Sequence, residues 1–195
     1  MIRARGLGRR FGDKRVLAGL DLDVGSRELL LVTGPNGSGK TTLLRLIAGL
    51  IVPTAGEIEV DADRAHIGFL AHEPLVYREL TPLENLELYG RLYRIPERRE
   101  RIGMLLERFG LWDARHESTA ALSRGMLQRL ALCRTLLHDP ELVLLDEPFT
   151  SLDAAGSELL LDELTDDARR TIVVASHQPE RLGDRPTSRL ALAAT

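Results

Sequence analysis

Hydrophobic positions along the chain follow two patterns that alternate. Continuous apolar runs occur at residues 29–32, 142–145 and 171–175, and such runs are typical of strands buried on both faces of a parallel sheet. After the first run, apolar residues recur at a spacing of three to four, which is typical of one face of a helix. These residues are Leu43, Leu44, Ile47 and Leu50. Residues 159–164 predict a second, crossover helix, so the pattern indicates an α/β core.

Shorter elements with turn residues between them surround the first apolar run. They are strands at residues 2–5, 16–24, 57–60 and 66–70, with turns at residues 12–13 and 53–56. The assignments rest on apolar and polar alternation and on glycine and proline at the turns. Phe11 stands directly before the first turn in polar surroundings. There its ring could stack on a nucleotide base or pack locally.

Helix signals dominate the middle of the chain. Residues 81–84 form a capping box with proline at the first helical position. Apolar residues at 102, 105, 106 and 109 repeat the helical spacing, and Gly110 follows them as a C-terminal cap. Ser123 can cap a further helix that ends at Asp139-Pro140. We therefore predict a single domain over residues 1–195, with an α/β core at 1–73 and 139–195 and an inserted helical subdomain at 74–138.

Composition narrows the class of protein. The chain has 195 residues and a net charge of −3, so it has no basic excess of the kind that binds nucleic acid. No apolar run reaches the roughly 18 to 20 residues that a membrane span needs, and no signal-peptide core follows the first residues. We expect a soluble cytoplasmic protein. Cys133 is the only cysteine, which excludes an internal disulfide and predicts a small buried thiol.

A glycine-rich stretch joins the first buried strand to the following helix. It consists of Gly34, Pro35, Asn36, Gly37, Ser38, Gly39, Lys40, Thr41 and Thr42. Its glycines let backbone N–H groups approach a phosphate chain at the positive end of a helix. Lys40 adds a point charge for the β and γ phosphate oxygens, and Thr41 adds a hydroxyl for Mg²⁺. The sequence therefore predicts a nucleotide site.

Two carboxylates follow the apolar run at residues 142–145. Asp146 and Glu147 stand at the carboxyl end of that strand, where open α/β sheets bind their ligands. The first carboxylate can hold Mg²⁺, and the second can orient or deprotonate an attacking water. His177 follows the next buried strand. We therefore predict that all three side chains lie at one edge of the sheet.

Over nearly its whole length, the chain resembles the ATP-binding cassette ATPases. The resemblance rests on the order of motifs: the phosphate loop, then Leu122-Ser123-Arg124-Gly125-Met126, residues 142–147, Thr150-Ser151-Leu152-Asp153 and His177. It implies a P-loop NTPase core with a mainly parallel sheet, an N-terminal antiparallel β subdomain and an inserted helical subdomain. It also implies ATP and Mg²⁺ as ligands and ATP hydrolysis as the activity.

The resemblance further implies a role for each matching residue. Phe11 would stack on adenine, Lys40 and Thr41 would hold phosphate and Mg²⁺, Asp146 would complete the metal site, and Glu147 would be the general base. His177 would contact the γ-phosphate. Two cassettes would pack head to tail, so that Ser123 and Gly125 reach the γ-phosphate of the opposite subunit, with Asp153 at the interface. Ser123 would cap its helix in either case, and the alternative is that it serves only as that cap.

Two positions depart from the family pattern. The signature commonly has glycine and glutamine where this chain has Arg124 and Met126, while Ser123 and Gly125 are retained. The family usually has a glutamine near the Mg²⁺ site, and His72 stands in its place. A neutral imidazole can accept or donate one hydrogen bond, so we predict that His72 takes over part of that role.

The resemblance also suggests partners and a location. Most such cassettes drive a separate transmembrane subunit and lie peripherally on the cytoplasmic face of the membrane. Leu75, Tyr77 and Leu80 are candidate docking residues, with burial against the helical subdomain as their alternative. The residues around 71–74, 79–86 and 176–179 look most like the ATP-binding subunit of the haem exporter of cytochrome c maturation. The alternatives are a drug, lipid or other small-molecule exporter, and a non-transport cassette acting on DNA or ribosomes.

Overall fold

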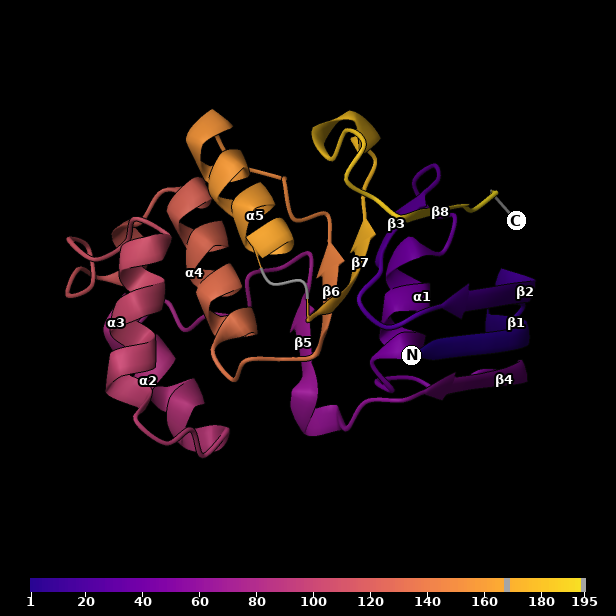
Figure 1. Cartoon of the computed structure of the whole chain (residues 1–195), viewed down its shortest axis with the longest axis horizontal. Helices are drawn as coiled ribbons and strands as arrows, with labels where there is room; N and C mark the ends of the chain where they lie inside the picture. The colour runs from indigo at the N-terminus through magenta and orange to yellow at the C-terminus, as the bar shows by residue number, and fades with distance from the viewer. Residues whose placement is uncertain (167–168, 194–195) are drawn as a thin grey trace.

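A parallel sheet forms the centre of the molecule (Figure 1). The computed structural model describes residues 1–166 and 169–193. Within these residues the sheet has five strands in the order β5-β6-β7-β3-β8, and every neighbouring pair is parallel. The strands are β3 (Leu29–Thr33), β5 (Ile67–Leu70), β6 (Leu142–Asp146), β7 (Thr171–Ala175) and β8 (Ser188–Ala191). Every residue of β6 and β7 is buried, as continuous apolar runs predict.

A second sheet of antiparallel strands lies on one side of the first. Its described strands are β1 (Ile2–Phe11), β2 (Lys14–Val24) and β4 (Ala55–Val60), in the order β2-β1-β4. Helix α1 (Lys40–Ile47) lies between the two sheets and contacts both (Figure 1). The fold class predicted from the sequence is therefore confirmed, including the N-terminal antiparallel strands.

The strand predictions are wrong at the end of β1 and at the start of β4, and they omit β8. β1 extends to Phe11 instead of ending at residue 5, because irregular register shifts after Ala4 let it keep its pairing with β2. The turn predicted at residues 53–56 is shorter, since Ala55 already pairs with Gly8. β8 was not predicted at all. It has no continuous apolar run, and it is ordered by pairing with β3.

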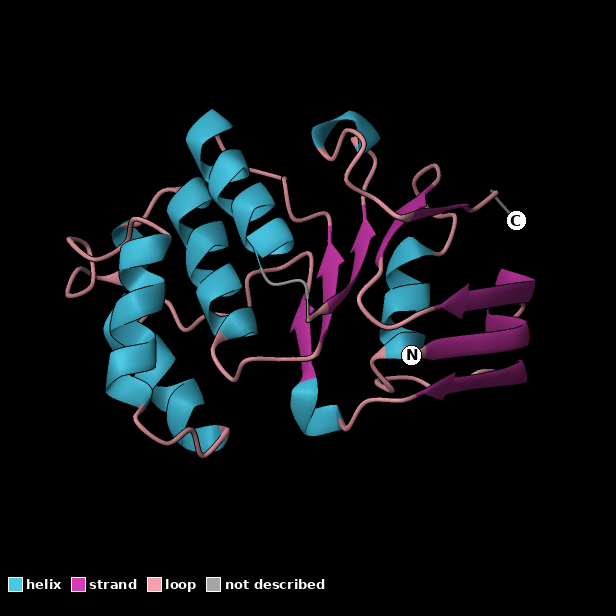
Figure 2. Cartoon of the chain, viewed as in Figure 1, coloured by secondary structure: helices cyan, strands magenta, loops and turns pink. Residues whose placement is uncertain are grey.

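Helices cover the other face of the main sheet (Figure 2). Residues 74–138 contain α2 (Pro82–Leu92), α3 (Arg98–Arg108) and α4 (Arg124–Leu136), and α5 (Ala154–Asp166) lies beside α4. The main sheet separates two hydrophobic cores. Leu29 and Leu31 face the helices, whereas Leu30 and Val32 face α1 and the antiparallel sheet. Cys133 is fully buried in the helical core, and its burial raises the pKa of the thiol.

The capping box at the start of α2 gives a first testable prediction. Thr81 Oγ1 accepts from the backbone N–H of Glu84 at 3.2 Å, and Glu84 Oε2 accepts from the backbone N–H of Thr81 at 2.8 Å. Thr81→Ala should lower the free energy of unfolding by about 1 kcal/mol, because it removes one of these bonds at a helix start. Chemical denaturation measures the change. Ser118→Ala is the matched control, since the Ser118 side chain makes no cap hydrogen bond; equal losses in both variants would contradict the prediction.

Candidate nucleotide site

The phosphate loop lies between the end of β3 and the start of α1. Gly34 comes so close to its neighbours that a Cβ atom there would lie 2.5 Å from the carbonyl oxygen of Leu192 and 2.6 Å from Ser38 Oγ. Only glycine fits that space. A pocket of about 540 Å³ opens beside the loop. It is lined by Lys14, Val16, Asn36, Gly37, Gly39, Lys40, Thr41, Thr42, His72, Asp146 and Glu147.

Lys40 lies at the first position of α1, and its side chain is only 7% exposed. Its ammonium donates to the carbonyl oxygens of Gly34 at 2.8 Å and Pro35 at 3.3 Å. The same nitrogen lies 3.8 Å from Glu147 Oε1. The loop thus holds a buried positive charge at the positive end of a helix, an arrangement that attracts an anionic ligand.

Thr41 and Asp146 meet on the other side of the pocket. Thr41 Oγ1 donates to Asp146 Oδ2 at 2.8 Å. Burial, with a smaller contribution from the charge of Glu147, raises the pKa of Asp146, while the hydrogen bond from Thr41 opposes that rise. A hydroxyl and a carboxylate side by side are oxygen ligands of the kind Mg²⁺ prefers, and a cation would relieve the cost of the buried charge. These residues therefore fit a Mg²⁺ ion.

In the described part of the chain, however, no group of three or more His, Cys, Asp or Glu residues could hold a metal by itself. Mg²⁺ usually keeps several waters and uses substrate phosphates as ligands. A metal at Thr41 and Asp146 would therefore depend on the phosphates of a bound nucleotide. His72 lines the same pocket, and its positive form would lower the pKa of Asp146.

Glu147 and His177 come from the ends of two adjacent strands. Glu147 Oε2 accepts from His177 twice, from Nδ1 at 2.7 Å and from the backbone N–H at 3.1 Å. Glu147 has a φ of +52°, a left-handed conformation that costs energy in a residue with a Cβ. Its backbone N–H donates to the carbonyl of Ala175 at 2.8 Å, which holds it in this conformation beside β7. The strained turn aims the carboxylate at both Lys40 and His177.

The other predicted site residues lie apart from this cluster. Phe11 is 46% exposed at the end of β1, with the Arg9 guanidinium 4.5 Å from its ring centroid, and it does not line the pocket. Ser123 caps α4 and accepts from the backbone N–H of Met126 at 3.2 Å. Ser123 and Gly125 also do not line the pocket. A Cβ on Gly125 would lie 2.9 Å from the carbonyl of Ser151, so α4 approaches the Ser151 loop closely.

Several pocket and loop contacts were not predicted from the sequence. Lys14 and Val16 line the pocket from the hairpin that also carries Phe11. The buried Gln128 donates from Nε2 to the carbonyl of Pro148 at 3.1 Å and so ties α4 to the segment after Glu147. None of these residues belongs to a sequence motif, and only the tertiary structure shows that they contact the pocket or its loops.

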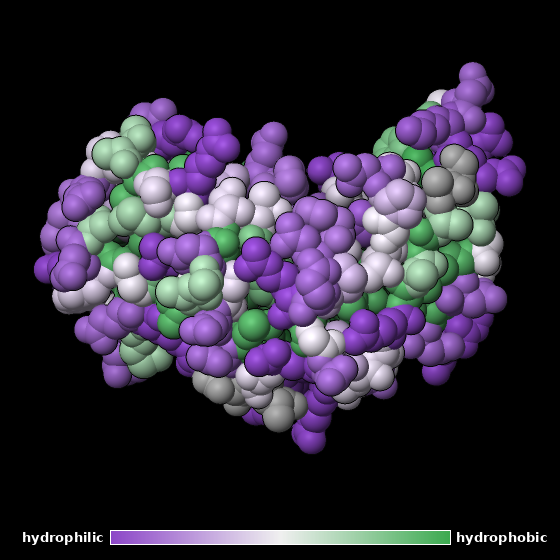
Figure 3. Space-filling model, turned by 90° about the horizontal axis from the view of Figure 1, so that it is seen from above, coloured by the Kyte–Doolittle hydropathy of each residue, from purple (hydrophilic) through white to green (hydrophobic). Residues whose placement is uncertain are grey.

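The face of the molecule at the carboxyl ends of the strands is mostly hydrophilic, with small hydrophobic areas between the hydrophilic ones (Figure 3).

Comparison with known proteins gives consistent matches. A family model described as ABC transporter matches residues 17–150. The chain is 42% identical over 170 residues to the daunorubicin resistance ATP-binding protein DrrA3 of Streptomyces coeruleorubidus, covering 82% of this chain and 54% of that protein. It is 36% identical over 188 residues to the cytochrome c biogenesis ATP-binding export protein CcmA of Cupriavidus necator, covering 91% and 83% of the two chains.

A solved structure matches the whole chain. This is the dimeric structure of MJ0796, a bacterial ABC transporter cassette, with a TM-score of 0.85 and 28% sequence identity. The match covers 100% of this chain and 95% of the other. By contrast, the chain spans only about half the length of the daunorubicin resistance protein.

Proposed function

The chain belongs to the ABC transporter ATP-binding family, and from this premise we propose that it binds and hydrolyses Mg-ATP to power a membrane transporter. One observation carries the proposal. The phosphate loop presents Lys40 beside a hydroxyl and carboxylate pair that fits Mg²⁺, and Glu147 lies 3.8 Å from that same lysine, paired with His177. Phosphate binding, metal binding and water activation are thereby available in one pocket.

The proposed roles follow from this geometry. Backbone N–H groups of residues 36–42 and the Lys40 ammonium would bind the β and γ phosphates, which would draw Lys40 from the carbonyls of Gly34 and Pro35. Thr41 and Asp146, with His72 nearby, would hold Mg²⁺, which supplies charge neutralisation at the phosphates. Glu147 would orient and deprotonate water, and His177 would contact the γ-phosphate. Phe11 would stack on adenine.

A complete site would need a second copy of the chain. Ser123 and Gly125 lie at the start of α4 and outside the pocket formed by their own chain. We propose that two chains pack head to tail, so that each α4 start meets the nucleotide of the other chain. The N-terminus of a 13-residue helix favours an anion, which supports this arrangement. The similar MJ0796 cassette is described as dimeric.

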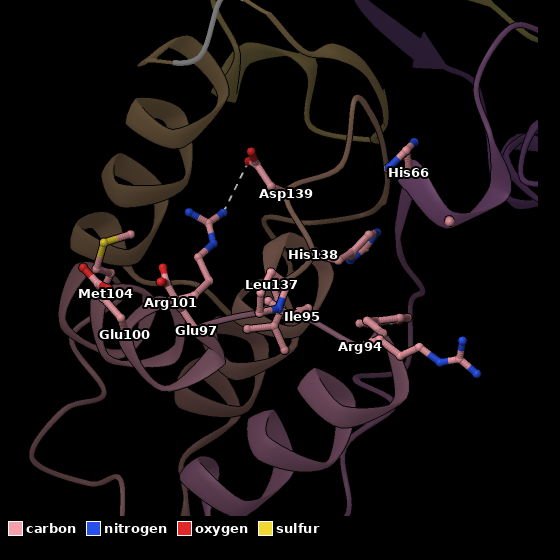
Figure 4. Close-up of a pocket in the computed structure, with 13 residues that line it drawn as sticks. His66, Arg94, Ile95, Glu97, Glu100, Arg101, Met104, Leu137, His138 and Asp139 are labelled. Atoms are coloured by element: carbon pink, nitrogen blue, oxygen red, sulfur yellow. Dashed lines mark hydrogen bonds and ion pairs between the residues drawn. The ribbon is translucent and has the colours of Figure 1, made fainter.

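A second pocket supports docking of a membrane subunit (Figure 4). It has a volume of about 520 Å³ and lies between the start of α3, the residues after α4 and the short helix η1 (Arg64–His66). Tyr93, Ile95 and Met104 give it apolar surface, and Glu97, Glu100 and Arg101 give it charge.

The structure contains no helix, in the part it describes, that is long and apolar enough to cross a membrane.

A row of tyrosine rings leads from the loop at residues 74–80 to this second pocket. Tyr77 and Tyr89 have ring centroids 6.4 Å apart, and Tyr89 and Tyr93 have centroids 6.1 Å apart. Leu75 and Tyr77 are about half exposed. We propose that a cytoplasmic segment of a separate transmembrane subunit binds along this row, with Leu80 at its edge. The chain would then lie peripherally on the cytoplasmic face of the membrane.

There are two candidates for the transported molecule. We propose export of a small molecule, with haem export for cytochrome c maturation as the specific candidate, because CcmA matches over nine tenths of this chain. A drug exporter is the second candidate, because the daunorubicin resistance protein has the higher identity. A non-transport cassette acting on DNA or ribosomes is the alternative outside transport, and the net charge of −3 does not favour it.

Affinity purification from detergent-solubilised native membranes tests the proposal. The Glu147→Gln protein, loaded with Mg-ATP, should co-purify with a polytopic membrane protein whose identity separates the haem candidate from the drug candidate. Tyr77→Arg in the same background should lose that partner and keep ATP binding. Glu59→Arg, an exposed change on the antiparallel sheet, should keep both. Recovery of ribosomes or DNA-associated proteins instead would contradict transport.

A further inference from the structure

Helix α3 begins with two glutamates that line the second pocket. Glu97 is the N-cap residue of α3, and Glu100 follows in the first turn. Both are exposed, and neither carboxylate has a hydrogen bond or an ion pair with another described residue. Figure 4 shows them together with Met104 on one side of the pocket. We call this side, formed by Glu97, Glu100 and Met104, the acidic wall.

The start of α2 shows what a glutamate at this position does when its role is to cap a helix. Glu84 lies three residues after the N-cap residue Thr81, and its carboxylate accepts from the backbone N–H of Thr81 at 2.8 Å. Glu100 lies three residues after Glu97 but makes no such bond, and the Glu97 side chain does not cap α3. Glu97 also has a φ of +51°, a left-handed conformation that costs energy in a residue with a Cβ. Helix capping therefore does not explain these two carboxylates.

The arginines that line the pocket leave the acidic wall uncompensated. Arg101 lies four residues after Glu97, a spacing at which glutamate and arginine can pair on a helix. Its guanidinium is turned the other way, and Nη2 donates to the carbonyl of Leu136 at 3.0 Å and to Asp139 Oδ1 at 3.4 Å. The Arg94 side chain points away from the pocket (Figure 4). The two glutamates therefore keep their negative charge for a group from outside.

The rest of the pocket offers aromatic and apolar surface. Tyr93 is 41% exposed and Met104 is 50% exposed, and the rings of Tyr93 and His138 have centroids 4.5 Å apart. Burial lowers the pKa of His138, whose Nε2 lies 3.2 Å from the carbonyl oxygen of Ile67, and this favours the neutral ring. His66, the other histidine of the pocket, lies across it from α3 on η1. Apolar surface next to two carboxylates suits a long cationic side chain, because its stem is apolar and its head is charged.

We propose that the acidic wall binds a lysine or arginine in the cytoplasmic segment of the membrane subunit, with an apolar residue of that segment beside it. The proposal rests on the docking of such a subunit that is part of the proposed function. Cytoplasmic loops of membrane proteins carry an excess of lysine and arginine, so the charge of the wall complements this kind of partner. The stem of the basic residue would pack on Met104 and Tyr93, and its head would lie between Glu97 and Glu100. The same charges would exclude acidic segments.

Site-specific photo-crosslinking identifies the occupant of the pocket. The crosslinking amino acid p-benzoylphenylalanine takes the place of Met104 in the Glu147→Gln chain, which is incubated with Mg-ATP and detergent-solubilised native membranes. The crosslinked peptide is then sequenced by mass spectrometry. It should come from a cytoplasmic segment of a polytopic membrane protein and carry a lysine or arginine within about one helical turn of the crosslinked residue. A segment without a basic residue, a second copy of this chain, or no crosslink within a complex that forms would overturn the proposal.

Charge variants test the two glutamates themselves in the same background. Glu97→Lys combined with Glu100→Lys should lower the recovery of the membrane protein by about tenfold or more, because like charges would then face each other. Glu97→Gln combined with Glu100→Gln nearly keeps the shape of the wall and should lower recovery less. Glu107→Lys is the matched control, since Glu107 is an exposed glutamate of α3 outside the pocket. All of these variants should keep ATP binding, which shows that they fold.

A charge swap gives the rescue. Once the crosslinked peptide identifies the basic residue of the membrane subunit, its replacement by glutamate should restore binding to the double lysine variant. The same replacement should weaken binding to the chain that keeps both glutamates. Equal recovery of the membrane protein by the double lysine variant and by its parent chain would contradict a contact with the acidic wall.

The outcomes separate this proposal from the proposed function. If Glu147→Gln recovers no membrane protein, transport and the basic contact both fail. If a membrane protein is recovered and the double lysine variant recovers as much of it, transport stands and the basic contact fails. If the double lysine variant loses the partner but Glu147→Gln hydrolyses ATP at the normal rate, the contact stands and the catalytic assignment of Glu147 fails.

Discussion

Replacement of Glu147 by glutamine is expected to slow ATP hydrolysis by about a hundredfold while Mg-ATP binding is retained. The amide has nearly the shape of the carboxylate, so its oxygen can still accept from His177 Nδ1 and from the backbone N–H at the same position. What is lost is the negative charge that is proposed to take a proton from water. Lys40, 3.8 Å away, would still bind phosphate, and removal of a nearby acid would leave its charge freer to do so. Single-turnover hydrolysis and equilibrium nucleotide binding measure the two effects separately.

Glu141→Gln is the matched control for this prediction. Glu141 is an exposed glutamate directly before β6, the strand at whose other end Glu147 lies, so the same chemical change is made away from the pocket. Its hydrolysis rate should equal that of the unmodified chain. Near-normal turnover in Glu147→Gln would remove Glu147 from the role of general base. Loss of nucleotide binding would mean instead that the carboxylate shapes the phosphate loop.

Much of the fold could be predicted because its strongest signals are local. A strand that is buried on both faces needs apolar residues at nearly every position, and β6 and β7 are buried throughout. The start of α2 was evident because Thr81 and Glu84 complete each other's hydrogen bonds within one turn. β8 lacks such a signal. Its half-buried residues form a strand only because β3 offers a free edge.

In the candidate site, too, features with a local sequence signal were predicted and features that depend on tertiary contacts were not. The phosphate loop, Asp146 and Glu147 were predicted as site residues because each lies at the carboxyl end of a buried strand and carries its chemistry in adjacent residues. The 2.8 Å contact of Thr41 with Asp146 joins residues 105 positions apart, yet strand order alone brings them to one edge of the sheet. The contact of Gln128 Nε2 with the carbonyl of Pro148 was not predictable, because no local pattern relates α4 to the segment after Glu147.

Replacement of Ser123 by arginine is expected to abolish ATP hydrolysis and leave ATP binding by the single chain intact. Ser123 is exposed at the start of α4 and does not line the pocket of its own chain. In a head-to-tail dimer, a long cationic side chain there would block close approach to the partner's nucleotide. The change also removes the cap to Met126, which costs about 1 kcal/mol. Ser118→Arg, at the exposed cap of a short helix, should leave hydrolysis unchanged.

Mixing two inactive variants tests whether the site is shared between chains. Lys40→Ala damages the phosphate loop, and Ser123→Arg damages the start of α4. In a head-to-tail heterodimer of these variants, one site combines the intact loop of one chain with the intact α4 of the other, and the second site carries both defects. An equimolar mixture should therefore recover part of the hydrolysis that neither variant shows alone. If Ser123 acted on the nucleotide of its own chain, every site in the mixture would be damaged and no activity would return. Loss of ATP binding in Ser123→Arg alone would likewise contradict the shared site, because the pocket residues of that chain are untouched.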